Sequence, residues 1–356
     1  MTQEYEKKES EPVERSQIEC IDDFERAARE ALSPENVEYV FLGTESEITL
    51  KRNVSAYSKY ALRRRVLQDI DEVDFSTSYF DGRISSELPF FPGPVNVGPF
   101  YPGALLDELK AAQRFSIPFF ISHLSIVRPL EVSSIPGLVK RKSGSSLIWQ
   151  IYLQTQNVDL CYKQARQAKS WGYKALALTV DCELSVKLRN KMPSLIGDNS
   201  FVKVTPREVR KFSECTSLPL IIKGVMTPED AEIAIESGAE GIVVSNHGGR
   251  TLDHGQATLD VLPEIVRHLK SKKKTRSAEI FFDGGIRRGT NILMALALGA
   301  RACLMGRATL WAVAAERGEG VEHAITILKA ELERAALLCG VAKISNVPQN
   351  ILRPYS

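Results

Sequence analysis

The chain has 356 residues, and its 46 basic and 44 acidic side chains leave a net charge of only +2. This near balance favours neither a nucleic-acid partner nor an anionic membrane surface. No run approaches the roughly 18 consecutive apolar residues that span a bilayer, so no membrane segment is expected.

Residues 1–20 are rich in Glu and Lys and nearly lack large apolar side chains, which predicts a disordered tail rather than a secretory signal. The six cysteines show neither CxxC pairs nor zinc-like spacing to histidine, which indicates a reducing compartment and predicts no metal site. The final Pro354-Tyr355-Ser356 is not a peroxisomal address. We therefore expect a cytoplasmic protein.

Residues 21–82 are predicted to form a helical segment that closes one end of the domain that follows. From residue 83 to 345, short apolar runs alternate with helical patterns, as in repeated βα units of a parallel sheet, and residues 346–356 form a tail. The near-continuous apolarity of the runs favours strands covered on both faces. The eight predicted strands are Leu88–Phe91, Pro118–Ser122, Ile148–Tyr152, Ala175–Thr179, Leu220–Lys223, Gly241–Ser245, Ile280–Asp283 and Ala302–Gly306.

Helices are best marked in the second half of the chain. Thr227-Pro228 supplies a capping hydroxyl and a proline at the first helical position, and Gly238 ends that helix. Thr205-Pro206 repeats the same start signal, and a further helix is expected over Asn291–Leu298. Eight strands with interposed helices predict an α/β fold, a (β/α)8 TIM barrel, the alternative being an open doubly wound sheet.

Polar residues end seven of the eight predicted strands or begin the loops that follow them. In a barrel these positions gather at the carboxyl-terminal face, where the chemistry of such folds takes place. They are Ser122, Gln150, Tyr152, Thr179, Asp181, Lys223, Ser245, His247, Arg250, Asp283, Gly306 and Arg307.

The most informative stretch is Ser245-Asn-His247-Gly-Gly-Arg250, which follows an apolar strand. Its glycines let the backbone approach a ligand closely, histidine is a titratable base near neutral pH, and arginine can fork onto a carboxylate. This combination predicts a site that binds an acid and removes a proton from it.

Two glycine-arginine loops follow the last two strands, where barrels commonly bind phosphate. They are Asp283-Gly284-Gly285-Ile-Arg287 and Gly306-Arg307. Each loop taken alone is explained equally well as a phosphate-binding loop or as a glycine turn with a surface arginine. Their placement on neighbouring strands favours a phosphorylated ligand.

Lys223 ends its strand, so its ammonium is expected to enter the site, either beside an electron-accepting ring or as a Schiff-base amine. A lysine that merely caps the strand is the alternative.

Asp181 either orients His247 or caps a helix. Tyr152 and Tyr39 either donate to a substrate or place their rings in the core, and for Tyr39 the residues alone favour the core.

Taken together, Leu220-Ile-Ile-Lys223-Gly-Val, Ser245-Asn-His247-Gly-Gly-Arg250, Asp283-Gly-Gly-Ile-Arg287-Arg-Gly and the Ala295–Arg307 stretch resemble the FMN-dependent 2-hydroxy acid oxidase/dehydrogenase family. Weaker similarity extends to Trp149–Tyr152, Leu178–Asp181 and Glu38–Gly43. The likeness covers most of residues 30–345.

This resemblance implies FMN as cofactor, a small 2-hydroxy acid as substrate, and O2 or another electron acceptor. His247 would take the substrate's proton, with Asp181 stabilising the charged imidazole. Arg250 and Tyr39 would hold the carboxylate, Tyr152 the hydroxyl, and Lys223 the flavin N1/O2 edge. The remaining implied cofactor contacts are Pro94, Val95, Asn96, Ser122, Gln150, Thr179, Ser245 and Asp283 around the ring, and Gly284, Gly285, Arg287, Gly306 and Arg307 at the phosphate. Relatives are commonly tetramers or larger, so a homo-oligomer is expected.

Four positions depart from the family pattern. The second carboxylate-binding arginine is missing, with Lys187 and Arg189 only out of register. Asn96 stands where a small residue is usual beneath the flavin, which predicts altered oxygen reactivity. The lid between Asn190 and Leu218 is short, and Leu124 replaces a common aromatic residue.

The leading hypothesis is therefore FMN-dependent oxidation of a 2-hydroxy acid to a 2-oxo acid. An alternative is a divergent FMN-binding barrel with an altered, bulkier substrate or little redox turnover. A Schiff-base aldolase using Lys223 leaves His247 and Arg250 unexplained.

Overall fold

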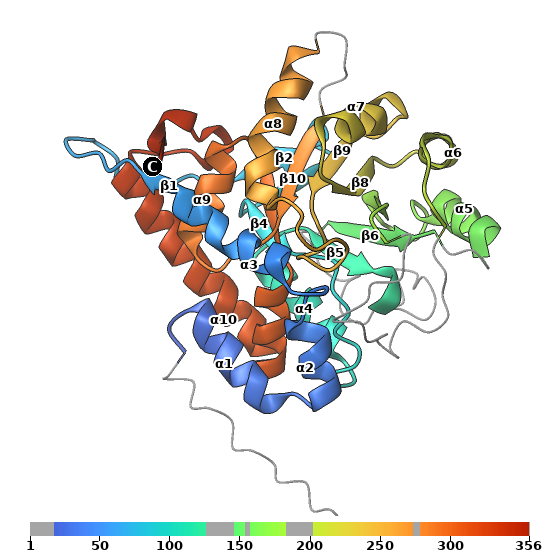
Figure 1. Ribbon diagram of the computed structural model, residues 1–356, viewed down its shortest axis with the longest axis horizontal. Coiled ribbons are helices and arrows are strands. Elements are labelled where there is room, and N and C mark those ends of the chain that lie inside the picture. The colour runs from blue at the N-terminus through green and yellow to red at the C-terminus, as the bar shows by residue number, and fades with distance from the viewer. Residues whose placement is uncertain (1–17, 126–145, 154–156, 183–201, 273–277, 356) are drawn as a thin grey trace, which may run out of the picture.

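The structure is a computed structural model that describes residues 18–125, 146–153, 157–182, 202–272 and 278–355 (Figure 1). Eight strands form one sheet in which each hydrogen-bonded neighbour is parallel. The end strands of this sheet pack beside each other, so the sheet is nearly closed into a barrel. The strands are β4 (Phe90–Pro92), β5 (Phe119–Ser122), β6 (Leu147–Tyr152), β7 (Ala175–Thr179), β8 (Leu220–Val225), β9 (Gly241–Val244), β10 (Glu279–Asp283) and β11 (Ala302–Met305).

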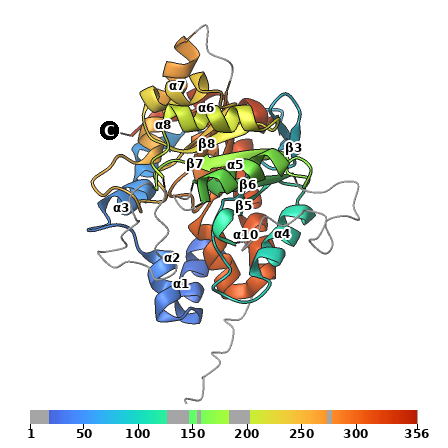
Figure 2. The ribbon, with the colours of Figure 1, turned by 90° about the vertical axis from the view of Figure 1, so that its right-hand side faces the viewer.

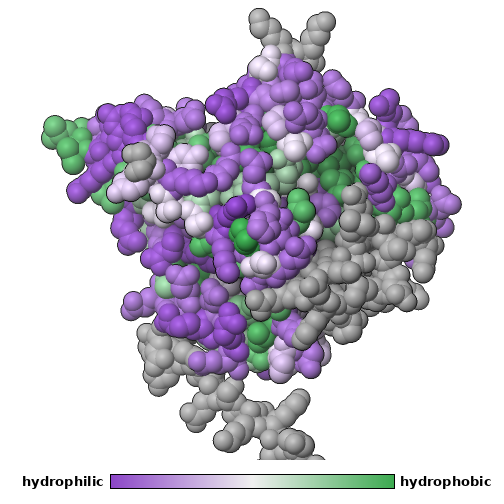
Figure 3. Space-filling view, in the orientation of Figure 1, coloured by the Kyte–Doolittle hydropathy of each residue, from purple (hydrophilic) through white to green (hydrophobic). Residues whose placement is uncertain are grey.

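All eight predicted apolar runs form these strands, which confirms the (β/α)8 barrel. Helices lie outside the strands, and Figure 2 shows α5 and α6 on the outer side of β6, β7 and β8. The face of the molecule in Figure 3 is mostly hydrophilic over α8 and α10. The helices are α4 (Ala104–Arg114), α5 (Val158–Gln167), α6 (Pro206–Cys215), α7 (Pro228–Glu236), α8 (Thr258–Ser271), α9 (Gly289–Ala297) and α10 (Arg307–Cys339).

The helix starts follow the sequence signals. The hydroxyl of Thr227 accepts the backbone N–H of Asp230 at 3.1 Å, and Thr205 exchanges hydrogen bonds with Glu208 across the first turn of α6. The helix expected at residues 291–298 is α9, which begins two residues earlier. The long α10 is interrupted at Glu316 and Arg317, whose backbone angles are not helical.

The N-terminal segment begins with three helices, α1 (Ile21–Ala31), α2 (Pro34–Phe41) and α3 (Ile48–Ser55). Figure 1 shows α1 and α2 beside α10. Residues 60–82 contain no helix: β1 (Tyr60–Leu62) is followed by the antiparallel hairpin of β2 (Thr77–Tyr79) and β3 (Ile84–Ser86). The Asp81-Gly82 turn and the alternating burial of both strands account for this difference from the predicted helical segment.

Residues 346–356, predicted as a tail, instead contribute β12 (Leu352–Pro354), which pairs antiparallel with β1. Of the predicted tail at 1–20, only residues 18–20 are described, and Ile18 is buried. Short 3-10 turns complete the described elements, at Ala56–Lys59, His123–Ser125, Ile344–Asn346 and Gln349–Ile351. Among the described helices, none combines the length and apolarity that a membrane crossing requires.

The β2–β3 hairpin covers the amino-terminal end of the barrel. Tyr79 and Phe80 pack on Phe281 of β10, with ring centroids 5.3 and 6.0 Å apart. Phe91 stacks on Phe120 at 5.9 Å in the same cluster. Because aromatic side chains fill this end, the open end of the barrel is the carboxyl-terminal one.

Glu108 on α4 is an unusual member of the core. It is 1% exposed, and its Oε1 has no hydrogen-bond partner among the described residues. Burial raises the pKa of Glu108 well above its usual range, so the folded protein holds this carboxyl in its neutral form.

In the unfolded chain the pKa of Glu108 is about 4.3, and in the folded protein it is higher. We expect the free energy of unfolding to fall as the pH rises from the lower of these two pKa values through the higher one. Between these two pKa values the folded state binds one proton more than the unfolded state, so each rise of one pH unit lowers the free energy of unfolding by about 1.4 kcal/mol. Glu108→Gln should flatten this dependence, and the exposed Glu87→Gln should not. Urea unfolding between pH 5 and 8.5 at fixed ligand concentration measures the slopes; equal slopes in all three proteins would refute the assignment.

Candidate active site

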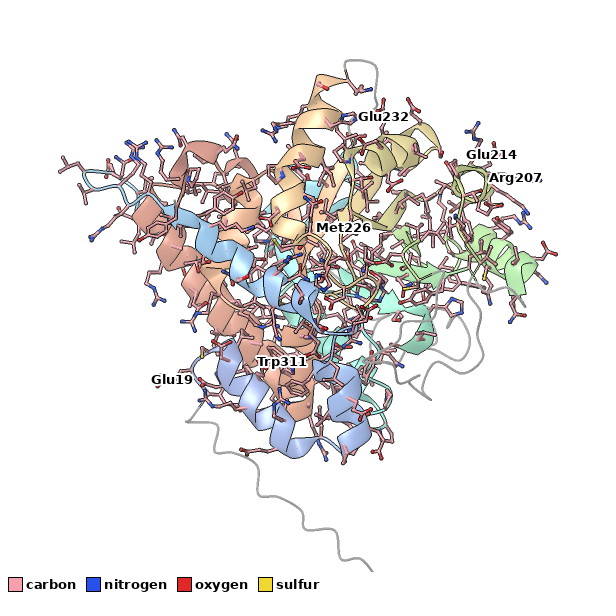
Figure 4. All side chains as sticks on the ribbon, in the orientation of Figure 1. Glu19, Arg207, Glu214, Met226, Glu232 and Trp311 are labelled. Atoms are coloured by element: carbon pink, nitrogen blue, oxygen red, sulfur yellow. The ribbon has the colours of Figure 1, made fainter. Side chains whose placement is uncertain are left out.

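A cavity opens at the carboxyl ends of the strands and holds about 1160 Å³, counted out to open solvent. Trp311, labelled in Figure 4, lies on α10 just after β11 and so marks this end. Most of the predicted site residues line the cavity: Tyr39, Pro94, Val95, Asn96, Ser122, Tyr152, Lys223, His247, Arg250, Asp283, Gly284, Gly285, Arg287, Gly306 and Arg307. The others, Gln150, Thr179, Asp181 and Ser245, lie behind the lining.

His247 stands directly after β9 with a positive φ of 57°, a conformation that costs energy for any residue except glycine. Its Nδ1 lies 3.1 and 3.2 Å from the two carboxylate oxygens of Asp181. Its Nε2 lies 3.5 Å from the hydroxyl of Tyr152, which also lines the cavity. The imidazole is therefore held by a carboxylate on one edge, and its other nitrogen is next to the cavity.

The charge on Asp181 is maintained in spite of its position. Burial by itself raises the pKa of this carboxyl, but the charge of His247, the hydrogen bond to it and the charge of Lys223 together bring the pKa below its usual value. An ionised carboxylate accepts the proton carried on Nδ1 and so fixes the tautomer and orientation of the ring. This is the arrangement that a proton acceptor at Nε2 needs.

Lys223 belongs to a buried polar chain that joins three neighbouring strands. Its Nζ donates to Ser245 Oγ at 2.9 Å and lies 3.4 Å from Asp283 Oδ2, to which Ser245 Oγ also donates at 2.9 Å. Burial lowers the pKa of Lys223, but the Asp283 and Asp181 carboxylates outweigh it, and the net shift is upward. A permanent cation, only 5% exposed, therefore stands in the cavity wall.

The N-terminal segment forms part of the same wall and is tied to it by Arg250. This side chain donates to the carbonyls of Tyr39 and Val40, and its guanidinium lies 5.1 Å from the Tyr39 ring centre. The Tyr39 hydroxyl accepts the backbone N–H of Asn96 at 3.2 Å. Arg250 and Tyr39 therefore meet in the cavity, as predicted, although Tyr39 comes from outside the barrel.

The predicted phosphate arginines have further roles in this structure. Arg307 donates from Nε, Nη1 and Nη2 to the carbonyls of Val40, Gly248 and Leu42 at 2.8–3.1 Å. Three of its five N–H groups are thus used on backbone. Arg287 lies over the Trp311 ring, 4.3 Å from its centre. Burial lowers the pKa of both guanidinium groups, which makes an anion a favourable neighbour.

Gly284 and Gly285 are required by close packing as well as by any ligand. Both have positive φ, and a Cβ would lie 2.1 Å from Thr258 Oγ1 or 2.0 Å from the carbonyl of Asn53. Gly306 differs, because a Cβ there would meet only Val95 Cγ1 at 3.9 Å. The backbone at Gly306 is therefore open to the cavity.

The cavity fits FMN in two respects: it has unfilled space, and a buried polar atom beside it has no hydrogen-bond partner among the described residues. Gln150 Nε2 donates to Thr179 at 2.8 Å, but its buried Oε1 has no partner among the described residues and can accept from a flavin ring nitrogen. The open backbone at Gly306, the two arginines and the Lys223 cation suit a phosphorylated, electron-accepting ring.

Several cavity residues were missed by sequence reasoning. Cys182 is the most notable, since it lines the cavity and its Sγ is 3.3 Å from His247 Nδ1. Its position next to Asp181 was the available signal. Leu304 and Leu310 add apolar lining. Asn246, which does not line the cavity, exchanges two hydrogen bonds with Asn53 of α3 at 2.8 and 2.9 Å.

Among the departures from the family pattern, Asn96 and Leu124 both line the cavity. The Oδ1 of Asn96 accepts the Gly98 N–H at 3.1 Å, which fixes the amide. Lys187, Arg189 and the beginning of the short lid, residues 190–201, lie outside the described residues.

Comparison with known proteins agrees with this geometry. The chain matches the profile of the FMN-dependent dehydrogenase family over residues 28–199 and 187–354. It is 33% identical to a peroxisomal (S)-2-hydroxyacid oxidase of Arabidopsis thaliana over 365 residues, covering 95% of this chain and 97% of that protein. It is 31% identical to human 2-hydroxyacid oxidase 1 over 370 residues, covering 94% and 96%.

Solved structures give the same result. The flavin-binding domain of baker's yeast flavocytochrome b2 superposes with a TM-score of 0.85 at 30% identity, covering 95% of this chain and 87% of that one. A mandelate oxidase variant with (S)-mandelic acid superposes with a TM-score of 0.82 at 30% identity, covering 95% and 98%.

Proposed function

Since the chain belongs to the FMN-dependent dehydrogenase family, it is an FMN-dependent enzyme that oxidises a 2-hydroxy acid to a 2-oxo acid, and we propose that His247 is the base in this reaction. The observation that carries the proposal is the placement of its imidazole. Nδ1 is held by the Asp181 carboxylate, and Nε2 lies beside the Tyr152 hydroxyl at the cavity. Bound FMN supplies the two-electron acceptor.

His247 Nε2 accepts the proton that the substrate loses, and Asp181 stabilises the resulting imidazolium through the Nδ1–H bond. Tyr152 orients the substrate hydroxyl toward Nε2. Arg250, whose charge is permanent, binds the carboxylate through its remaining N–H groups, with the Tyr39 hydroxyl beside it.

The cofactor contacts are proposed for three parts of the wall. Lys223 would offset negative charge on the ring, and the Ser245–Asp283 chain behind it holds the ammonium in place. The backbone of residues 94–96 would hold the ring, with Ser122, Gln150 and Thr179 contributing polar atoms. The phosphate is held by the residues of the two glycine-arginine loops, namely Gly284, Gly285, Arg287, Gly306 and Arg307.

A bulky substrate side chain is a second possibility that one observation favours. Leu124 lines the cavity at a position where the family often carries an aromatic residue. A smaller residue there leaves more room beside the bound acid. This supports a bulkier 2-hydroxy acid rather than the shortest ones.

Anaerobic mixing of the FMN-loaded protein with a panel of 2-hydroxy acids tests the function. We expect the visible absorption of the flavin to disappear with at least one acid of the short, aromatic and long classes, and the corresponding 2-oxo acid to form in equal amount. Acids without a 2-hydroxyl serve as controls. A panel without any bleaching would overturn the proposed reaction and favour a divergent barrel with little redox turnover.

The electron acceptor is O2 or another oxidant. Asn96 supports altered oxygen reactivity, because its amide lines the cavity in place of a smaller side chain. A homo-oligomer and a cytoplasmic location remain sequence predictions, and the Arabidopsis relative is named as peroxisomal.

A further inference from the structure

Three side chains that can bind a transition metal meet at the edge of the cavity. Ligand atoms of Asp181, Cys182 and His247 all lie within 4.8 Å of one another. Cys182 Sγ is 3.3 Å from His247 Nδ1 and 3.5 Å from Asp181 Oδ1, and Nδ1 is 3.1 Å from that oxygen. Tetrahedral zinc with N and O ligands at about 2.0 Å and sulfur at about 2.3 Å separates its ligands by about 3.3 to 3.6 Å. The three atoms thus form a face of such a tetrahedron after shifts of a few tenths of an ångström.

We propose that Asp181, Cys182 and His247 form an inhibitory Zn²⁺ site that binds His247 through Nδ1. The inhibition rests on the proposed role of His247 as base; the binding does not. The fourth position is open to water, because Cys182 lines the cavity and the ion can enter from there.

The proton balance explains why zinc at this place inhibits. Cys182 releases its thiol proton to solvent, and the Asp181 carboxylate and the thiolate together neutralise the two positive charges of the ion. The proton on His247 Nδ1 moves to Nε2, because Nδ1 must present its lone pair to the metal. Nε2 then carries a proton and cannot accept the one that the substrate must lose.

The chemistry of the three ligands selects the metal. Thiolate and imidazole favour zinc and other soft or borderline ions over Mg²⁺ and Ca²⁺, which prefer oxygen ligands. Burial raises the pKa of the Cys182 thiol well above its usual value, so the metal rather than the medium must displace its proton. The positive charges of Lys223 and Arg250 act on the same thiol and oppose a cation, which limits the affinity.

The test uses EDTA-treated, FMN-loaded protein titrated with Zn²⁺, with Mg²⁺ as the control ion. We expect one zinc per chain, one sulfur at about 2.3 Å in zinc-edge X-ray absorption, and a rate of flavin reduction that falls with zinc occupancy. Cys182→Ser should remove the sulfur signal and weaken zinc binding at least about tenfold. Even the loss of a residue that only hydrogen-bonds to a metal ligand typically weakens binding by that much. Cys215→Ser, a half-buried cysteine on α6, should change neither.

Each variant is compared with its own zinc-free rate, so an altered basal activity does not affect the result. Absence of zinc uptake, or zinc without a sulfur neighbour, overturns the site. Zinc bound through sulfur with an unchanged reduction rate overturns the inhibition. If zinc-free protein bleaches with none of the acids, the proposed reaction fails, while zinc uptake and the sulfur distance still decide the site.

Discussion

Replacing His247 by asparagine should lower the rate of anaerobic flavin reduction by about 10²- to 10⁴-fold, the usual contribution of a positioned acid or base. Asparagine has no basic nitrogen to take the substrate's proton, yet it tolerates the left-handed backbone at this position, where φ is 57°. The loop should therefore keep its conformation. Stopped-flow bleaching measures the rate, and flavin absorption per chain shows that the cofactor is still bound.

His254 offers a matched control in the same loop. It also has a positive φ, of 56°, but its side chain is exposed and does not line the cavity. His254→Asn should reduce its flavin at the wild-type rate. If His247→Asn also keeps the wild-type rate, or if both variants slow equally, His247 is not the base.

Replacing Lys223 by methionine should lower the free energy of unfolding by about 3 to 5 kcal/mol, because it leaves a buried charge without its partner. The side chain is 6% exposed and that of Asp283 15%, so water cannot replace the lost ammonium well. FMN should also bind more weakly, since a permanent cation is removed from the wall. Urea unfolding at a fixed FMN concentration and titration of the protein with FMN measure the two effects.

A double variant separates the buried charge from the loss of packing. Lys223→Met combined with Asp283→Asn removes both charges, so most of the lost stability should return, although flavin affinity should not. Lys272→Met is the control for an ion pair at the surface. It breaks a 2.6 Å contact with Glu232, but its side chain is 42% exposed, and it should change stability by no more than about 1 kcal/mol. A double variant no more stable than Lys223→Met would contradict the charge argument.

The barrel was predictable because its strands are buried on both faces. A run such as Ala175–Thr179 is apolar at nearly every position, and its ends in the structure are those expected from sequence. The hairpin at residues 77–86 was missed, because its two strands are only three residues long each and alternate between buried and exposed positions. Its Asp81-Gly82 turn was the one local signal available.

The site was predictable where residue type and strand end coincide, as at His247 and Lys223. It was not predictable where tertiary packing decides the partner. No local pattern shows that Arg307 donates to the carbonyls of Val40 and Leu42, which are far away in the chain. Cys182 was missed as a cavity residue for a related reason, because its neighbour His247 comes from the loop after a different strand.

β4 pairs with β11, and Arg250 and Arg307 donate to backbone carbonyls at the C-terminal end of α2, so segments far apart in the sequence form one wall. A ribosome must therefore release the chain at least through Arg307 before the pocket has walls. Until then a nascent chain has no place for its cofactor, and truncated translation products should be recognisable as colourless, protease-sensitive fragments.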